Sequence, residues 1–154
     1  MILYYTYKQK TKIFAESLGH VLNLPTYELK AELNNKSEIG FAFNALKLTF
    51  TGKTTPISNM PEELPMEIFV CSPIWGGKPA APVKYFFENT NLLRTKVNLL
   101  LTASTPTEKY RTNSLEYMSK FCIPGEVFLF ATSDKVMPDG EILKEQLREI
   151  LDIE

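Results

Sequence analysis

Four short runs of almost continuously apolar residues constrain the fold of this chain most strongly. They cover residues 2–5, 67–71, 97–101 and 127–131. Such runs are typical of strands that are buried on both faces, as in a parallel sheet, because a half-exposed strand alternates apolar and polar side chains. A fifth, less apolar run over residues 26–30 predicts a strand at the edge of the same sheet.

Helical patterns lie between these runs. Apolar side chains recur at helical spacing over residues 13–22, 80–87, 115–122 and 142–151. Residues 38–50 predict a further helix with irregular spacing, and residues 51–66 predict a long loop because they contain Gly52 and three prolines. The alternation of strands and helices predicts a single α/β domain over residues 1–154, a three-layer α/β/α sandwich around a five-stranded parallel sheet.

Charge and cysteine content narrow the class of protein. The sequence has 17 basic and 18 acidic residues, so its net charge of −1 predicts neither nucleic acid nor an anionic membrane as a partner. No apolar run reaches the length of a membrane span, and no signal-peptide pattern is visible, which leads us to expect a cytoplasmic protein. Cys71 and Cys122 are far apart in the sequence, in keeping with a reducing compartment. With His20 as the only histidine, we expect no metal site and no histidine-based catalytic triad.

Candidate ligand-binding residues follow the strands of the predicted sheet. Ligands of open α/β sheets bind beyond the carboxyl ends of the strands. The residues there are Thr6, Tyr7, Lys8, Gln9, Lys10 and Thr11 after the first strand, Ser72, Pro73, Ile74, Trp75, Gly76 and Gly77 after the second buried run, and Thr102, Ala103 and Ser104 after the third. Two alternatives stay open, since the hydroxyls could simply cap helices and Trp75 could be a core residue.

Two phosphate-binding motifs are absent. No G-x-G-x-x-G sequence occurs, so the dinucleotide-binding fingerprint is missing. Residues 52–54, Gly-Lys-Thr, match the end of a P-loop, but Lys47 stands where its first glycine should be, and no buried strand precedes it.

The chain resembles the flavodoxin-like family of FMN-binding proteins, in its short form. The resemblance extends over essentially the whole chain and is best over residues 68–87, which include most of the segment SPIWGGKPAAPVKYFFEN. It implies the strand order 2-1-3-4-5 and FMN as cofactor. The family's first loop, commonly T/S-x-T-G-x-T, holds the FMN phosphate. Here Lys8 replaces the middle hydroxyl and Gln9 replaces the glycine.

The resemblance also implies roles for the other candidate residues. Trp75 would stack on one face of the flavin ring, with Ile74, Gly76 and Gly77 around it. Thr102, Ala103 and Ser104 would approach the other side or the polar edge of the ring, with Tyr110 as a looser candidate for that face. Ser72 and Pro73 would shape the turn.

The resemblance implies a redox protein that carries electrons or reduces a small substrate through FMN, the latter as an FMN-dependent oxidoreductase. Its partner would be a redox protein or a small electron acceptor, and both a monomer and a homodimer remain open. No catalytic side chain is expected, because the flavin would perform the chemistry. Lys8, Lys10 and Lys78, set against Asp134, would favour the reduced, negatively charged flavin. The alternative hypothesis is a cofactor-free scaffold of the same fold that acts as a binding or interaction module.

Overall fold

The computed structural model describes residues 1–32, 40, 44, 47–48, 51–133 and 137–153. Most of the helix predicted over residues 38–50 lies outside the described residues, and so does Asp134. In chain order the elements are β1 (Ile2–Tyr4), α1 (Lys10–Leu22), β2 (Thr26–Glu28), β3 (Glu67–Trp75), β4 (Lys78–Pro79), α3 (Ala81–Asn89), β5 (Lys96–Ala103), α4 (Glu108–Met118), β6 (Ile123–Ala131) and α5 (Gly140–Leu151).

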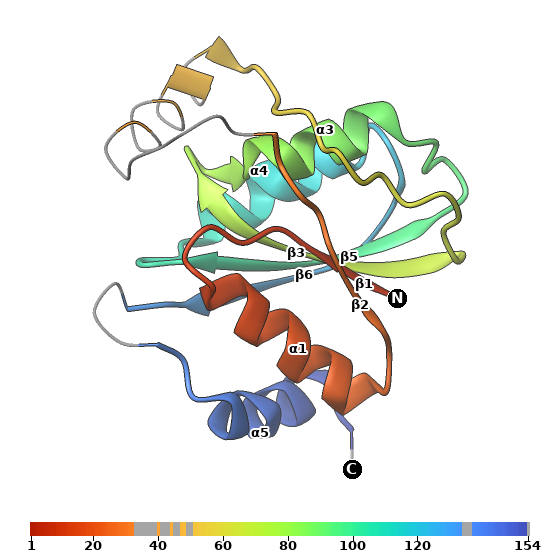
Figure 1. Cartoon of the computed structure of the whole chain (residues 1–154). Helices are drawn as coiled ribbons and strands as arrows, with labels where there is room; N and C mark the ends of the chain where they lie inside the picture. Colours follow the sequence, from red (N-terminus) through yellow and green to blue (C-terminus); the bar gives the residue numbers. More distant parts are fainter. Residues whose placement is uncertain (33–39, 41–43, 45–46, 49–50, 134–136, 154) are drawn as a thin grey trace.

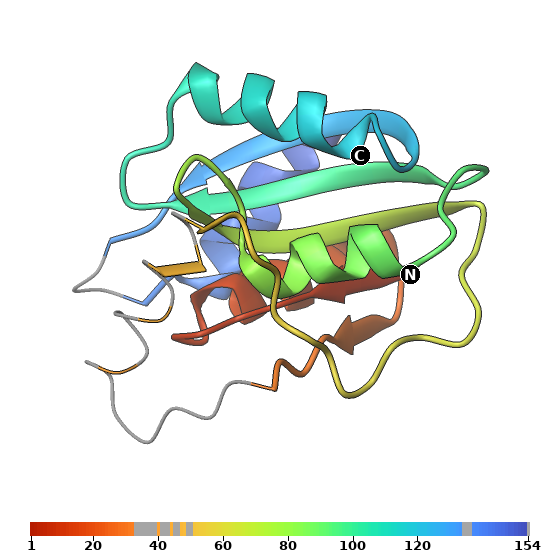
Figure 2. The same ribbon diagram turned by 90° about the horizontal axis from the view of Figure 1, so that it is seen from above.

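The strands form one sheet in the order β2-β1-β3-β5-β6, and the short β4 pairs with β3. Along this order each neighbouring pair is parallel. Figure 2 shows the strands side by side in this sequence, from β2 to β6. Apart from the added β4, the predicted parallel sheet and its order are confirmed.

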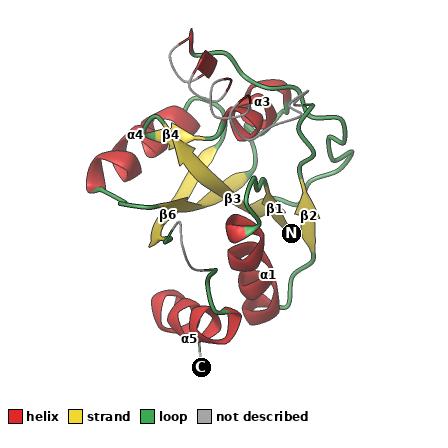
Figure 3. Ribbon diagram, turned by 60° about the vertical axis from the view of Figure 1, so that its left-hand side comes forward, coloured by secondary structure: helices red, strands yellow, loops and turns green. Residues whose placement is uncertain are grey.

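The helices cover both faces of this sheet. Figures 1 and 3 show α3 and α4 on one face and α1 and α5 on the other. The first face buries Val83, Phe86 and Phe87 of α3 in one apolar cluster, and the second buries Phe14 of α1 and Leu147 of α5 in another. Burial of apolar surface on both faces explains why the central strands are almost continuously apolar. The predicted three-layer α/β/α arrangement is confirmed.

The strand β3 is longer than the sequence predicted. It continues to Trp75 and turns back through Gly76 and Gly77 into β4, which pairs antiparallel with it. Both glycines have positive φ, 60° and 80°, as the two central residues of a type I′ hairpin turn require. The residues expected to form a loop therefore form a small hairpin at the carboxyl end of β3.

The helix predicted over residues 115–122 is also displaced. The observed α4 spans Glu108–Met118, and Cys122 follows it in a turn. Ser114 and Met118 are buried, whereas Leu115 is 40% exposed. Of the three residues in the predicted apolar stripe, Met118 and Cys122 therefore lie in the core, whereas Leu115 does not. None of the helices in the described part of the chain is long and apolar enough to cross a membrane.

Candidate functional site

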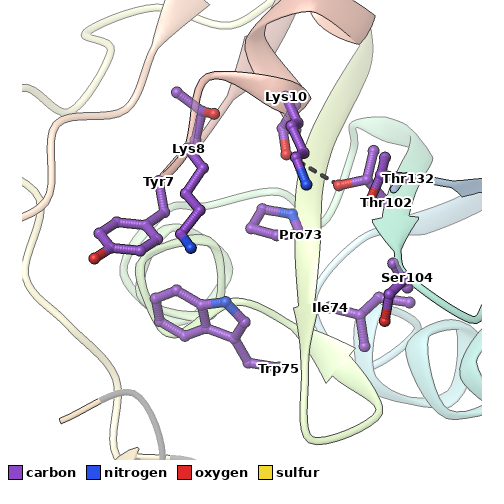
Figure 4. A pocket seen from close by; sticks show the side chains of 12 residues that line it. Tyr7, Lys8, Lys10, Pro73, Ile74, Trp75, Thr102, Ser104 and Thr132 are labelled. Atoms are coloured by element: carbon purple, nitrogen blue, oxygen red, sulfur yellow. Dashed lines mark hydrogen bonds between the residues drawn. The ribbon is translucent and has the colours of Figure 1, made fainter. Parts of the chain in front are cut away.

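A cavity of about 220 Å³ lies where β1, β3, β5 and β6 end and α1 begins. In Figure 1 the parallel strands run toward the left of the view, so the cavity lies at that side of the molecule. Figure 4 shows the cavity at close range. Its lining residues are Thr6, Tyr7, Lys8, Lys10, Thr11, Pro73, Ile74, Trp75, Thr102, Ala103, Ser104 and Thr132. The structure thus brings most of the candidate residues from three separate loops to one place.

The first turn of α1 begins with an unusual backbone conformation. Gln9, the residue before the helix, has φ 63° and ψ −9°, which is left-handed. Glycine adopts this conformation readily, whereas other residues avoid it. The loop therefore keeps a backbone shape suited to glycine although its sequence has glutamine. The Gln9 side chain is exposed and does not line the cavity, so it does not block the start of the helix.

The start of α1 also lacks a side-chain cap. Gln9 makes no capping hydrogen bond, whereas Asp139 at the start of α5 accepts hydrogen bonds from the backbone N–H groups of Glu141 and Ile142. The first N–H groups of a helix have no partner within the helix and carry its positive dipole end. The helix end beside the cavity can therefore serve an anion.

Three threonines of the cavity differ in the hydrogen bonds that their hydroxyl groups make. The Thr11 and Thr102 hydroxyls lie 3.0 Å apart, both buried, in the hydrogen bond drawn in Figure 4. This bond ties the start of α1 to the end of β5. The Thr6 hydroxyl oxygen is buried and has no hydrogen-bond partner among the described residues. A buried polar atom without a partner costs free energy, so Thr6 is suited to a ligand that supplies one.

Trp75 forms part of the opposite wall. It is partly buried at the end of β3, with its ring edge-on to that of Tyr5 at a centroid distance of 5.7 Å and an interplanar angle of 89°. The buried Tyr5 thus packs against the indole, and Figure 4 shows the indole beside the cavity, facing Tyr7 and Lys8. An indole fixed in this way offers a flat apolar surface to a ring-shaped ligand.

The described residues that line the cavity include two cations, Lys8 and Lys10, and no carboxylate. The Lys10 ammonium donates a hydrogen bond to the Ser133 backbone carbonyl, which joins the start of α1 to the segment after β6. Lys8 is exposed, and its side chain extends toward Trp75 (Figure 4). The cavity is therefore electropositive near both of its walls.

A second cavity of about 800 Å³ lies on the other side of the β3–β4 hairpin. It shares Ile74, Ala103 and Ser104 with the first cavity and adds Gly76, Gly77, Thr105, Thr107, Lys109, Tyr110 and Asn113. The Asn113 amide donates a hydrogen bond of 3.4 Å to the Gly77 carbonyl, which ties α4 to the hairpin. The two cavities thus adjoin across the ends of β3 and β5.

Not every candidate residue lines the first cavity. Ser72 is fully buried, where its hydroxyl donates to the Pro73 carbonyl and accepts from the Ala80 N–H. It supports the hairpin instead of facing a ligand, while Gly76 and Gly77 form the hairpin turn and line the second cavity but not the first. Thr132 lines the first cavity although it was not among the candidates. Its place directly after β6 at the same sheet edge is a signal that could have identified it.

A catalytic nucleophile and a metal site each place their own requirements on the described residues, beginning with Cys71. Burial raises the pKa of the Cys71 thiol, which keeps it protonated and makes it a poor nucleophile. Among the described residues, no group of three or more histidine, cysteine, aspartate or glutamate side chains could hold a metal ion. The described lining of the first cavity offers cations, hydroxyl groups and aromatic rings to a ligand.

Comparisons with known proteins identify the fold. No protein-family model matches the sequence, and no curated protein matches it. Among solved structures, a protein from Bacteroides uniformis is similar with a TM-score of 0.73 and 13% identity, over 96% of this chain and 96% of that chain. A flavoprotein in complex with FMN from Lactobacillus acidophilus has a TM-score of 0.68 and 21% identity, over 83% of this chain and 90% of that one.

An oxidised flavodoxin from Bacillus cereus is similar with a TM-score of 0.50 and 10% identity, over 98% of this chain and 95% of that one. At these identities the likeness concerns the arrangement of the backbone, which agrees with the sheet order described above. The chain has the flavodoxin-like fold.

Proposed function

We propose that this chain binds FMN in the first cavity and acts as a flavin-dependent redox protein. The observation that carries the proposal is the left-handed Gln9, which leaves the start of α1 open beside the buried hydroxyl of Thr6, which has no hydrogen-bond partner in the described part of the chain. A phosphate group fits this place, because it would accept hydrogen bonds from the helix N–H groups and from Thr6. The FMN bound to the flavoprotein of the same fold from Lactobacillus acidophilus supports the choice of ligand.

The residues divide into two groups by role. Backbone N–H groups of residues 8–11 and the Thr6 hydroxyl would hold the phosphate. Trp75 and Ile74 would contact the ring system from the β3 hairpin, while Thr102, Ala103 and Ser104 would do so from the end of β5. When bound, FMN supplies one- and two-electron redox chemistry. The protein's own contribution would be to bind, orient and tune the cofactor.

The partner of such a protein would be a redox protein or a small electron acceptor. The near-zero net charge of −1 argues against docking through a large acidic surface. The second cavity adjoins the first and is large enough for a small organic molecule. Both features favour the reduction of a small substrate over general electron shuttling. The free thiols Cys71 and Cys122 are both buried, and they suit the reducing conditions of the cytoplasm.

The experiment is a titration of the purified chain with FMN, followed through tryptophan fluorescence. Trp75 is the only tryptophan in the sequence, so its emission reports on this cavity alone. We expect saturable quenching at one FMN per chain and weaker binding of riboflavin, which lacks the phosphate. The same titration of Trp75→Phe, followed through flavin fluorescence, measures how much the indole contributes to binding.

The cofactor-free scaffold makes the opposite prediction. If the chain binds no cofactor, the purified protein should be colourless. Added FMN should then reduce the Trp75 fluorescence only by absorbing light, to the same extent as it reduces the fluorescence of free tryptophan in the same buffer. Equal dissociation constants for FMN and riboflavin would still agree with a flavin site. They would contradict a phosphate site at the start of α1.

A further inference from the structure

We infer that Lys8 is an electrostatic tuning residue, which shifts the bound flavin toward its two-electron-reduced form. This inference rests on the proposed function. It concerns the ring of the cofactor and not its phosphate, although Lys8 lies in the loop that would hold the phosphate.

The direction of the side chain separates Lys8 from the start of α1. The side chain lines the cavity, and Figure 4 shows it extending away from the helix and toward Trp75. Trp75 belongs to the wall assigned to the ring system under the proposed function. The Lys8 ammonium therefore lies on the ring side of the cavity, whereas the N–H groups of α1 serve the phosphate side.

The two lysines of this loop differ in their partners. The Lys10 ammonium donates to the Ser133 carbonyl and so has a role within the protein. Within the described part of the chain, the Lys8 ammonium has no hydrogen-bond or ion-pair partner, and the residue is exposed. Its charge is therefore available to a ligand.

The rest of the cavity lining does not cancel this charge. The described lining residues include no carboxylate, and those of the adjoining second cavity include Lys109 and likewise no carboxylate. Reduction of an oxidised flavin takes up two electrons and one proton, so the neutral ring gains one negative charge. A nearby cation favours that product over the neutral oxidised ring.

We expect the Lys8 charge to raise the equilibrium constant for flavin reduction about tenfold, because solvent partly screens a charge pair at an exposed lysine. For a two-electron couple, tenfold corresponds to about 30 mV. Removal of the Lys8 charge should therefore lower the two-electron midpoint potential by about 30 mV.

The experiment is an equilibrium titration of the FMN-loaded chain with dithionite, in the presence of a reference dye. It compares wild type with Lys8→Gln, Lys8→Arg and the control Lys12→Gln. Lys12 is a lysine in α1 whose ammonium lies 3.8 Å from the Glu16 carboxylate, and it does not line the cavity. The dissociation constants of FMN and riboflavin are measured for each variant.

We expect the lower potential in Lys8→Gln, the wild-type potential in Lys8→Arg and no change in Lys12→Gln. An unchanged potential in Lys8→Gln would overturn the inference while leaving FMN binding intact. So would a selective loss of FMN affinity over riboflavin at constant potential, because Lys8 would then serve the phosphate. Failure of the wild-type chain to bind FMN would overturn the proposed function itself, and this inference with it.

Discussion

Substitution of Gln9 tests the backbone conformation on which the proposed phosphate site depends. Gln9 has φ 63°, and its side chain makes no capping hydrogen bond and is exposed. Gln9→Gly and Gln9→Ala therefore remove the same side-chain interactions. They differ in how well each new residue tolerates a left-handed backbone.

The magnitude follows from two opposing contributions. At an ordinary helical or extended position, glycine is less stable than alanine by about 0.5–1 kcal/mol, because it loses more conformational freedom on folding. A left-handed backbone costs a residue with a Cβ about 1–2 kcal/mol. The difference predicts that Gln9→Gly is more stable than Gln9→Ala by roughly 1 kcal/mol. For a domain of this size, that is a difference in melting temperature of about 2–4 °C.

The assay is urea unfolding of the ligand-free variants, with one control position just after the same helix and one within it. Asn23, which follows α1, is also left-handed with φ 51°, so glycine should again be more stable than alanine there. Glu16 is exposed within α1, and alanine should be more stable there. If alanine is more stable than glycine at position 9, as expected at Glu16, the left-handed conformation of Gln9 is refuted. The open helix end that depends on this conformation is then refuted as well.

Three further predictions concern the site and the stability of the fold. Thr102→Val should destabilise the chain by about 1–2 kcal/mol in urea unfolding, because it leaves the buried Thr11 hydroxyl without its partner; the double valine variant should recover much of that loss. Raising the ionic strength from about 0.01 to 0.15 M should weaken FMN binding more than riboflavin binding in parallel titrations, because salt screens the phosphate charge. Hydrogen bonds from Lys96 and Asn98 lower the pKa of the Glu67 carboxyl. Its ionised form therefore stabilises the fold above the unfolded-state pKa, and this contribution is lost as the pH falls through the folded-state pKa. Unfolding of wild type and Glu67→Gln in acid should accordingly show a shallower pH dependence for the variant, and equal slopes would contradict the assignment.

The sheet could be predicted from the sequence because its strands are buried on both faces. Apolar runs of this kind have few alternatives in a chain whose helical segments alternate with them. The end of β3 could not be predicted in the same way, since Ser72 and Pro73 resemble the start of a loop. In the structure the Pro73 carbonyl accepts a hydrogen bond from the Ala80 N–H, which closes the hairpin. Paired glycines between two extended segments are a hairpin signal, and residues 76–77 carry it.

The site was predictable in its location more than in its details. The carboxyl ends of parallel strands meet at one edge, which is why residues from three loops line one cavity. The conformation of Gln9 could not be predicted, because glutamine rarely adopts a left-handed backbone. The different roles of Lys8 and Lys10 depend on which carbonyl lies within reach of each ammonium group. That is a property of the folded chain and not of the loop sequence.

Tertiary contacts also determine which residue type is possible at some positions, and Gly125 is an example. A Cβ on Gly125 would clash with the Asn98 amide oxygen. That oxygen accepts a hydrogen bond from the Glu126 N–H, beside an irregularity in the pairing of β5 and β6. Glycine is therefore required here by a neighbouring strand, which a reading of the local sequence does not reveal.

Under the proposed function, the start of α1 holds a phosphate although glycine is absent from its loop. A crystal structure of the chain with FMN tests this directly. We expect a phosphate whose oxygens lie about 3 Å from backbone nitrogens of residues 8–11, with Gln9 still left-handed and the Thr6 hydroxyl bonded to the ligand. A flavin bound elsewhere, or crystals soaked in excess FMN in which the Gln9 side chain fills this place, would contradict it.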